Sequence, residues 1–389
     1  MILIKDKADC CGCTACASVC PKNAITMEPD VLGFKYPKVN LSKCIDCGLC
    51  EKVCAFNENY DKSLNLKEPE IYAARHKDIH EIETSRSGAA FIAISDYILD
   101  NGGIVYGVGY EDHFRVAHKR ATTKEERNEF KGSKYVQSNL DGIFRQVKED
   151  LKQGNTVLFS GTPCQTAGLN SYIGKKLREN LVLVDIVCHG VPSPYIWRDY
   201  IAYLEKKYNS KIIEVNFRDK TRIGWSGHIE SFVFENKKKI ELNVFKFLFG
   251  KNIMLRPSCG ACVFTNFTRP SDLTIGDYWG WEKISKDFNS DNKGCSLLIS
   301  NTIKGQLLLN NISNHLFLLK SNKEKSVQPN LEKPTAFDKG NTDFVMDFPK
   351  RGFQYVAKKY GNIGWKYLVN TKIKESKRKI KQIIKKINI

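Results

Sequence analysis

The chain has 389 residues, 42% of them hydrophobic and 27% charged, which indicates a globular protein and excludes an intrinsically disordered one. Its formal charge of +18 comes without a nucleic-acid-binding motif, so we expect no nucleic-acid partner. No run of about 18 uncharged apolar residues occurs, so we expect no membrane-spanning helix. The first of 14 cysteines stands at position 10, which leaves no room for a signal peptide. We therefore expect a cytoplasmic protein, in which clustered cysteines are more often metal ligands than disulfides.

Two cysteine runs near the N-terminus share the spacing C-x2-C-x2-C-x3-C. In bacterial two-cluster ferredoxins, three thiolates of such a run bind one cube and the fourth binds the other. We therefore predict two [4Fe–4S] clusters, one held by Cys10, Cys13, Cys16 and Cys54 and the other by Cys44, Cys47, Cys50 and Cys20. Zinc is the alternative metal, because C-x2-C pairs also form tetrahedral zinc sites. Cys11 falls outside the spacing and is interpreted as a spectator.

The pattern predicts an α+β / α/β chain: a small ferredoxin-like two-cluster domain, then a larger mixed α/β flavin-binding domain and a basic helical tail. We place the ferredoxin domain at residues 1–56 and a polar linker at 57–70. The larger domain is expected in two parts, 71–155 and 156–335, and the tail at 336–389.

The larger domain alternates predicted strands and helices. Strands are expected at 71–75 and 104–110, with a helix at 87–103 that Ser87 caps and glycines end. Residues 141–154 form a predicted helix, since Ile143, Val147 and Leu151 recur every four residues. Residues 155–173 and 179–208 each pass from a buried strand through a turn into a helix.

Four further cysteines predict a third site. Cys164 and Cys188 each follow the carboxyl end of a predicted strand, and parallel strands bring such ends to one edge of a sheet. Cys259 and Cys262 form a C-x2-C pair with no second pair nearby to complete a zinc site. A lone cysteine after a strand is more often part of core packing, but the two pairs together predict a four-cysteine site.

Several motifs in fixed order behind the ferredoxin pattern resemble the family of coenzyme F420 hydrogenase/dehydrogenase beta subunits, over roughly residues 1–335. These are SRSGAAFIAISDYIL, KGSKYVQS, LFSGTPCQTAGL, DIVCHGVPSP, CGACVFTN and DLTIGDYWG. The resemblance implies an FAD-containing iron–sulfur oxidoreductase that passes electrons between a one-electron partner such as ferredoxin and a small-molecule two-electron substrate. Relatives act on coenzyme F420, and others accompany polysaccharide biosynthesis.

The resemblance also implies site residues. Ser85, Ser87, Gly88 and Ala89 would hold the flavin phosphate at a helix start, where backbone N–H groups and the helix dipole favour an anion. The plainer interpretation makes Ser87 a helix cap. The flavin or its substrate would be lined by Lys134, Tyr135, Gln137, Thr162, Pro163 and Gln165. No complete G-x-G-x-x-G follows a strand, so FAD rests on the resemblance alone.

Two residues are candidates for catalysis. His189 could donate a proton near neutral pH, or simply hydrogen-bond a turn, and Lys134 could act on the substrate or be a solvated charge. Asp277 is expected to orient a ligand or cap a turn. Trp279 is expected in the core, and Cys295 as a buried filler.

The C-terminal stretch KIKESKRKIKQIIKKINI places Ile373, Ile380, Ile383, Ile384 and Ile387 mostly on one helical stripe among lysines. Such a helix can contact the inner face of a membrane, dock on an acidic partner, or pack on its own domain. Two alternatives to the oxidoreductase remain. One is an electron-carrier subunit without flavin chemistry that docks onto an enzyme, and the other is a zinc protein that binds nucleic acid.

Overall fold

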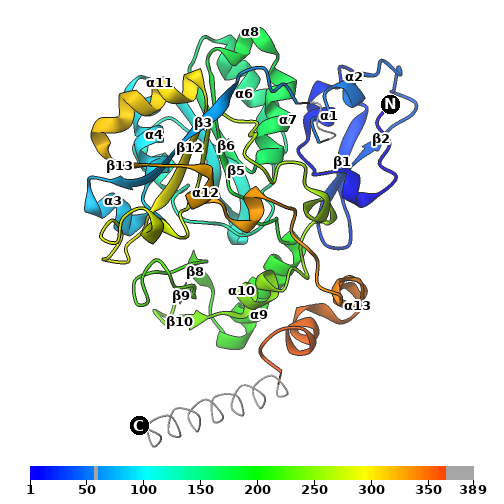
Figure 1. The fold of residues 1–389 in the computed structure, drawn as a ribbon. Coiled ribbons are helices and arrows are strands. Elements are labelled where there is room, and N and C mark those ends of the chain that lie inside the picture. The colour runs from blue at the N-terminus through cyan, green and yellow to red at the C-terminus, as the bar shows by residue number, and fades with distance from the viewer. Residues whose placement is uncertain (57–59, 365–389) are drawn as a thin grey trace, which may run out of the picture.

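The computed structural model describes residues 1–56 and 60–364 (Figure 1). The N-terminal part repeats one motif, a cysteine loop followed by a short helix. The helices α1 (Ala15–Val19) and α2 (Leu49–Lys52) each begin after a left-handed residue, Thr14 at φ 68° and Gly48 at φ 71°. Between them lie the antiparallel strands β1 (Ile25–Pro29) and β2 (Lys35–Val39), with Ile25 opposite Val39. The repeat seen in the cysteine spacing is therefore also a structural repeat.

The main domain is built on an eight-stranded sheet in the order β13-β3-β12-β11-β7-β6-β4-β5. The strands are β3 (Asn65–His76), β4 (Ile104–Glu111), β5 (Arg115–Ala121), β6 (Val157–Gly161), β7 (Leu181–Ile186), β11 (Leu273–Asp277), β12 (Ser296–Thr302) and β13 (Leu316–Ser321). The central pairs β4–β6, β6–β7 and β7–β11 are parallel, and the flanking pairs are antiparallel. The sheet is mixed, as the alternating pattern predicts.

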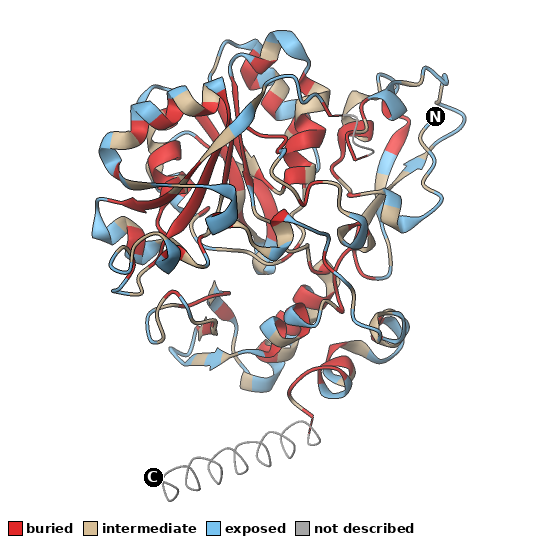
Figure 2. Cartoon of the chain, in the orientation of Figure 1, coloured by how far each residue is buried: buried red, intermediate tan, exposed pale blue. Residues whose placement is uncertain are grey.

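Helices cover both faces of this sheet (Figures 1 and 2), because successive side chains of a strand point to opposite sides. Phe159 packs with α6 (Ile143–Lys152) and α7 (Pro163–Ile173), on the face that also meets the N-terminal domain. Leu158 packs with α4 (Ala90–Asp100) and α11 (Ile303–Ile312) on the other face. Short helices complete the layers: α3 (Ile79–Thr84), α5 (Lys124–Asn128), α8 (Lys175–Arg178) and α12 (Lys323–Ser326).

A second lobe lies below the sheet in Figure 1 and has its own aromatic core. It consists of α9 (Pro194–Tyr208), β8 (Ile212–Asn216), β9 (Glu230–Phe234), β10 (Lys239–Leu242), α10 (Val244–Gly250) and α13 (Asn341–Lys359). Its three strands are antiparallel in the order β10-β9-β8. Single 3-10 turns occur at Lys7–Asp9, Asp112–Phe114, Pro257–Ala261, Trp281–Lys283, Ser313–His315 and Pro329–Leu331.

Three predicted boundaries differ from the structure. Strand β3 begins at Asn65, inside the predicted linker, because β12 pairs with its polar first half as well. Helix α4 begins at Ala90 rather than after a Ser87 cap, and its N-cap Ala89 makes no side-chain capping bond. Helix α13 lies inside the predicted tail, yet it packs on α9 through Phe353 and Tyr200, whose ring centroids are 5.0 Å apart. Residues 341–359 therefore belong to the second lobe.

The predicted isoleucine stripe at 373–387 lies outside the described residues. Within the described ranges, none of the helices combines the length and the apolar character that crossing a bilayer requires.

Candidate functional site

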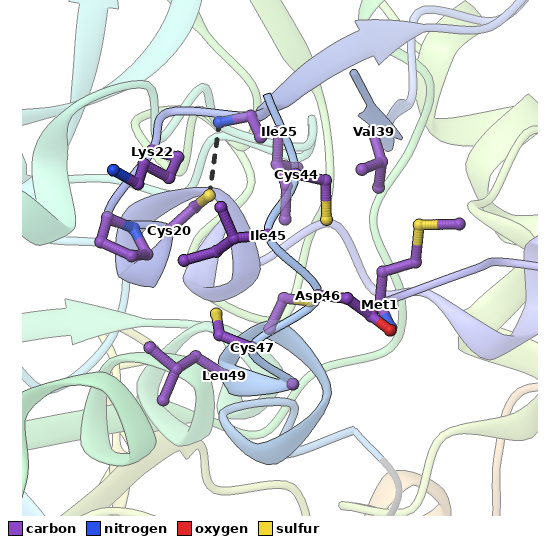
Figure 3. A pocket seen from close by; sticks show the side chains of 14 residues that line it. Met1, Cys20, Lys22, Ile25, Val39, Cys44, Ile45, Asp46, Cys47 and Leu49 are labelled. Atoms are coloured by element: carbon purple, nitrogen blue, oxygen red, sulfur yellow. Dashed lines mark hydrogen bonds and ion pairs between the residues drawn. The ribbon is translucent and has the colours of Figure 1, made fainter. Parts of the chain in front are cut away.

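Four N-terminal cysteines line one cavity, and they are the predicted second ligand set (Figure 3). Cys44, Cys47 and Cys50 reach it from the second repeat and Cys20 from the first. The backbone N–H of Ala24 donates to Cys20 Sγ at 3.3 Å, and that of Ile2 to Cys50 Sγ at 3.2 Å. Such donors stabilise sulfur in its thiolate form, which is the form that binds metal.

The first predicted set also lies together. Burial, followed by the charges of Cys13, Cys10 and Cys54, raises the pKa of the Cys16 thiol. Cys54 therefore lies beside the first run although it belongs to the second. A buried thiolate is costly without a compensating cation, and iron in a cluster supplies that compensation. The donor set thus fits an iron–sulfur cluster.

The third predicted set converges where β6 and β7 end. Cys164 is in the first turn of α7 and Cys188 follows β7, while Cys259 and Cys262 come from the loop before β11. Burial, and then the charges of Cys259, Cys164 and Cys262, raises the pKa of Cys188. The N–H of Val191 donates to Cys259 Sγ at 3.4 Å. The structure therefore brings together the four cysteines that the sequence pairs predict.

Zinc is the alternative metal for these cysteine sets. Within residues 1–56 and 60–364, no three Cys, His, Asp or Glu side chains are arranged to hold a single metal ion. A tetrahedral zinc site places its sulfur atoms about 3.8 Å apart, because Zn–S bonds are about 2.3 Å long. A [4Fe–4S] cube binds each thiolate at a different iron, so its sulfur ligands lie further apart.

Cys11 lies between the first and the third cysteine sets. Its buried thiol is in hydrogen-bonding contact with the sulfur atoms of Cys13 and Cys164. This hydrogen bond lowers the pKa of Cys13 and, to about 7, that of Cys164. The ligand spacing sets Cys11 apart from both cysteine runs, and it carries no information about a contact with Cys164, 153 positions away.

A group of buried cations lies beside the loop before α4. Arg218 pairs with Asp277 and donates to the Tyr135 hydroxyl at 3.2 Å, and Arg86 donates to the Arg218 carbonyl at 3.4 Å. Burial, with repulsion from Arg218, lowers the pKa of Arg86 to about 10. Burial, with repulsion from Arg86, lowers the pKa of Lys220 to about 8. Asp277 offsets only part of the positive charge of Arg86, Arg218 and Lys220, so the group is suited to an additional anion.

Three polar atoms of this group are buried without a hydrogen-bonding partner in the part of the chain that the structure describes. They are Ser85 Oγ, Arg86 Nε and Arg218 Nε. Buried polar atoms are rarely left unsatisfied, and phosphate oxygens would satisfy all three. We call Ser85, Arg86, Tyr135, Arg218 and Asp277 the cationic group. Only Ser85, Tyr135 and Asp277 were singled out from the sequence, because nothing local marks Arg86 or Arg218.

The other residues expected around the flavin phosphate make contacts within the protein. Ser87 Oγ donates to the Cys295 carbonyl at 2.7 Å. A Cβ on Gly88 would lie 2.2 Å from the Ala74 carbonyl oxygen, so this glycine allows the loop to pack on β3. Ala89 is left-handed at φ 61°. These contacts of Ser87 and Gly88 hold the loop before α4 against β3 and β12.

The remaining predicted lining residues contact protein groups near the cysteine loops. Thr162 Oγ1 lies 3.2 Å from Cys164 Sγ, and the Thr162 N–H donates to Gln165 Oε1 at 2.9 Å. Gln137 Nε2 donates to the Cys11 carbonyl at 3.0 Å. Pro163 is the first residue of α7. These residues position the cysteine loops and already have protein partners.

Both catalytic candidates form hydrogen bonds with protein groups. Lys134 Nζ donates to the carbonyls of Glu129 at 2.6 Å and Lys131 at 2.9 Å, and burial lowers its pKa to about 7. His189 Nδ1 lies 3.2 Å from Asn330 Oδ1, and Nε2 lies 2.6 Å from Asn252 Oδ1. With both ring nitrogens partnered, the geometry favours the plainer interpretation, in which His189 is hydrogen-bonded within the protein.

Two minor expectations have different outcomes. Trp279 is 42% exposed and stacks on buried Trp225 with ring centroids 4.5 Å apart, so its placement in the core was wrong. A tryptophan in a G-D-Y-W-G turn has no periodicity from which burial could be judged. Cys295 is fully buried, in the core cluster that contains Leu297 and Ile299.

Comparisons with known proteins agree with this domain order. Residues 154–325 match the family model for the C terminus of the coenzyme F420 hydrogenase/dehydrogenase beta subunit, and residues 9–57 match a 4Fe–4S dicluster domain. One F(420)H(2) dehydrogenase subunit, from Methanosarcina mazei, is 23% identical over 220 residues, covering 54% of this chain and 60% of its own length. An uncharacterized polyferredoxin-like protein of Methanocaldococcus jannaschii is 39% identical over 61 residues, covering 13% of this chain and 36% of its own.

A chain of the F420-reducing [NiFe] hydrogenase complex from Methanosarcina barkeri superimposes with a TM-score of 0.45 at 15% identity. The superposition covers 75% of this chain and 91% of that one. This chain spans less than two thirds of the length of the curated relatives that it matches.

Proposed function

Because the chain carries the C-terminal domain of the family of coenzyme F420 hydrogenase/dehydrogenase beta subunits behind a 4Fe–4S dicluster domain, we infer that it is an oxidoreductase. In this proposal electrons pass between the dicluster domain, a third cluster at Cys164, Cys188, Cys259 and Cys262, and an FAD-linked small-molecule substrate. Clusters exchange single electrons and a flavin exchanges one or two, which is the chemistry these cofactors would supply when bound.

The observation that carries the proposal is the position of Cys11. Its thiol contacts Cys13 of the first set and Cys164 of the third set. Ligands of two predicted clusters are therefore separated by one buried side chain. A dicluster domain that served only to anchor the chain would not require this proximity.

The cationic group supports an anionic cofactor or substrate in the main domain. Arg86 and Arg218 supply positive charge, and their unpartnered nitrogen atoms with Ser85 Oγ offer donors to phosphate oxygens. We propose that this group holds the flavin phosphate or a phosphate of the substrate. Lys134 and Tyr135 lie on the neighbouring loop, and Tyr135 is joined to the group through Arg218.

A second function, electron carriage without flavin chemistry, is favoured by one observation. Three of the predicted lining residues already form hydrogen bonds with protein groups, so they do not require a flavin: Gln137, Thr162 and Gln165. In that case the main domain would dock the chain onto a partner enzyme. Both functions imply a redox partner protein such as ferredoxin, and we propose a cytoplasmic location for both.

Anaerobic purification followed by iron, sulfide and flavin analysis separates the two functions. About twelve irons with one FAD per chain supports the oxidoreductase, and iron without flavin supports the carrier. Replacing Cys259 with Ser should remove about four irons, since it deletes one ligand of the third set. Unchanged iron content in that variant would contradict the third cluster.

The flavin proposal is tested at Arg218. Arg218→Met should lower the flavin content, while Arg222→Met, which removes an exposed guanidinium paired with Glu241, should not. Equal flavin in the two variants would contradict the role of the cationic group. Substrates are then compared by supplying reduced ferredoxin to the flavin-containing protein with coenzyme F420 and with sugar-pathway intermediates as acceptors.

A further inference from the structure

Arg256 is a buried cation whose side-chain partners are neutral. It is 1% exposed, and no acidic side chain pairs with it in the described part of the chain. Its nitrogen atoms donate to the Cys10 carbonyl at 2.8 Å, to Gln137 Oε1 at 2.9 Å and to the Lys35 carbonyl at 2.9 Å. Its guanidinium also lies 4.3 Å from the centre of the Tyr36 ring. A charge buried in this way requires compensation that these neutral partners do not fully provide.

The backbone of Arg256 is hydrogen-bonded within the loops that carry the third cysteine set. Its N–H donates to the Val191 carbonyl at 3.0 Å, and its carbonyl accepts from the Cys259 N–H at 2.9 Å. It thus precedes the 3-10 turn Pro257–Ala261 that carries Cys259. The side chain extends the other way and places Nη2 3.7 Å from Cys10 Sγ of the first set. One residue therefore joins the two cysteine sets, with its charge between them.

The N-terminal domain leaves space for this side chain. Gly12 stands between Cys10 and Cys13 at φ 71°, and a Cβ there would lie 2.8 Å from Arg256 Nη1. Larger residues at position 12 would collide with the guanidinium. The cysteine loop is therefore shaped around the cation as well as around its own ligands.

We propose that Arg256 is a positioning residue that raises the reduction potential of the clusters on either side of it. The inference rests on the proposed function, because it takes the first and third cysteine sets to hold clusters. One-electron reduction adds a negative charge to a cluster, and a fixed positive charge in a poorly solvated site stabilises that added charge. Neutral carbonyl and amide partners leave the charge of Arg256 available to the clusters.

The test is an anaerobic redox titration followed by electron paramagnetic resonance, with iron content measured on the same samples. In Arg256→Met, the equilibrium constant for reducing the cluster of the first set should fall at least tenfold, which is a shift of 59 mV to more negative potential for one electron. Arg256→Lys keeps the charge and should shift the potential by less than half as much. Full iron content with unchanged potentials in Arg256→Met would overturn the proposal.

Arg145→Gln is the matched control. Arg145 is an exposed guanidinium that also donates to carbonyls of the N-terminal domain, those of Ala17 at 2.9 Å and Ser18 at 3.2 Å. Because water screens its charge, the potentials should stay unchanged in this variant. A shift equal to that of Arg256→Met would show that domain docking, and not buried charge, sets the potential, and would overturn the proposal.

Gln137→Glu provides a second route if Arg256→Met loses iron. It sets a carboxylate against Arg256 Nη1, so it should lower the potential while the arginine stays in place. An unchanged potential in this variant would also overturn the proposal. Failure of the proposed function appears separately, as wild-type protein with about eight irons and no third cluster, and the shift at the first set would still be measurable.

Discussion

At the residue scale, the backbone conformation of Ala89 favours glycine, whereas the packing of its side chain favours alanine. It precedes α4 at φ 61°, where an L-residue with a Cβ is strained, and its methyl group is buried beside Ile82 and Ile92. The strain destabilises the folded state by roughly 1–2 kcal/mol. Burial of the methyl group stabilises it by about 0.8 kcal/mol. The two effects nearly cancel, so alanine is tolerated where glycine would fit better.

Ala89→Gly should therefore raise the free energy of unfolding by about 0.5 kcal/mol, since relief of strain slightly exceeds the lost burial. Urea unfolding under anaerobic conditions measures the change. The control is Ala90→Gly, one residue further on, where the helical backbone is unstrained and glycine should cost about 1 kcal/mol. Two equal losses of stability would contradict the strain at Ala89.

Cys11 is buried and contacts two predicted ligands, yet it stands outside both ligand spacings. Cys11→Ala should leave iron and sulfide content unchanged, because every predicted cluster keeps four cysteines. Cys16→Ala should instead remove about four irons, since it deletes a predicted ligand. Loss of one cluster's iron from Cys11→Ala would show that Cys11, and not a spaced cysteine, is a ligand.

At the scale of elements, the strand–turn–helix units were predicted well because their periodicity is local. The segments β6–α7 and β7–α9 follow the sequence pattern closely. Strand β3 was not foreseen over residues 65–70, because its polar residues become a strand only through pairing with β12. The packing of α13 on α9 was missed for a similar reason: its phenylalanines are spaced for a helix but do not say against which surface they pack.

Helix α10 is capped from another element. Its N-cap Asn243 makes no side-chain capping bond, and the carboxylate of Glu230 in β9 accepts from the N–H groups of Phe245 and Lys246 instead. Glu230 also accepts from the Tyr200 hydroxyl at 2.9 Å. Burial raises the pKa of Glu230 to about 7, although these hydrogen bonds oppose the rise.

The shifted pKa predicts how stability depends on pH. Between pH ~4.5 and ~7 the folded state keeps the Glu230 proton that the unfolded state has released, so this residue's contribution to stability falls as pH rises through that window. Glu230→Gln should remove that part of the decline, because glutamine is neutral throughout. Unfolding curves from pH 4.5 to 8 measure it, with the exposed Glu235→Gln as control. Identical pH slopes in wild type and Glu230→Gln would contradict the buried neutral acid.

At the scale of the whole molecule, the N-terminal domain docks on the face of the main sheet that α6 and α7 cover. Cys13 approaches α7 so closely that a Cβ on Gly168 would lie 2.7 Å from its Sγ and 2.8 Å from its Cβ. Phe144 of α6 flanks the same position, and Cys13 and Phe144 belong to one buried cluster. Close approach of the two domains brings the first cysteine set to the third.

Gly168→Ala should therefore disturb this docking, because the added methyl group overpacks the interface at a cost of about 1–3 kcal/mol. We expect a lower urea midpoint, reduced iron content and faster proteolysis between the domains. Gly250→Ala is the control, since nothing lies within 4 Å of a Cβ at that helical position. Normal iron content and stability in Gly168→Ala would contradict this close approach of the two domains.

The sequence by itself determined the cysteine sets, the repeat of the N-terminal domain and the parallel units of the main sheet. Ligand spacing, hydrophobic periodicity and turn residues are patterns among residues close in sequence, so they can be recognised without a structure. The tertiary structure alone decided which distant groups meet. Arg256 reaches Cys10 across 246 positions, and Cys11 reaches Cys164. Arg86 joins Arg218, and Trp279 is left at the surface. Such contacts depend on how whole elements pack, because burial and charge pairing are properties of the assembled core rather than of any one segment.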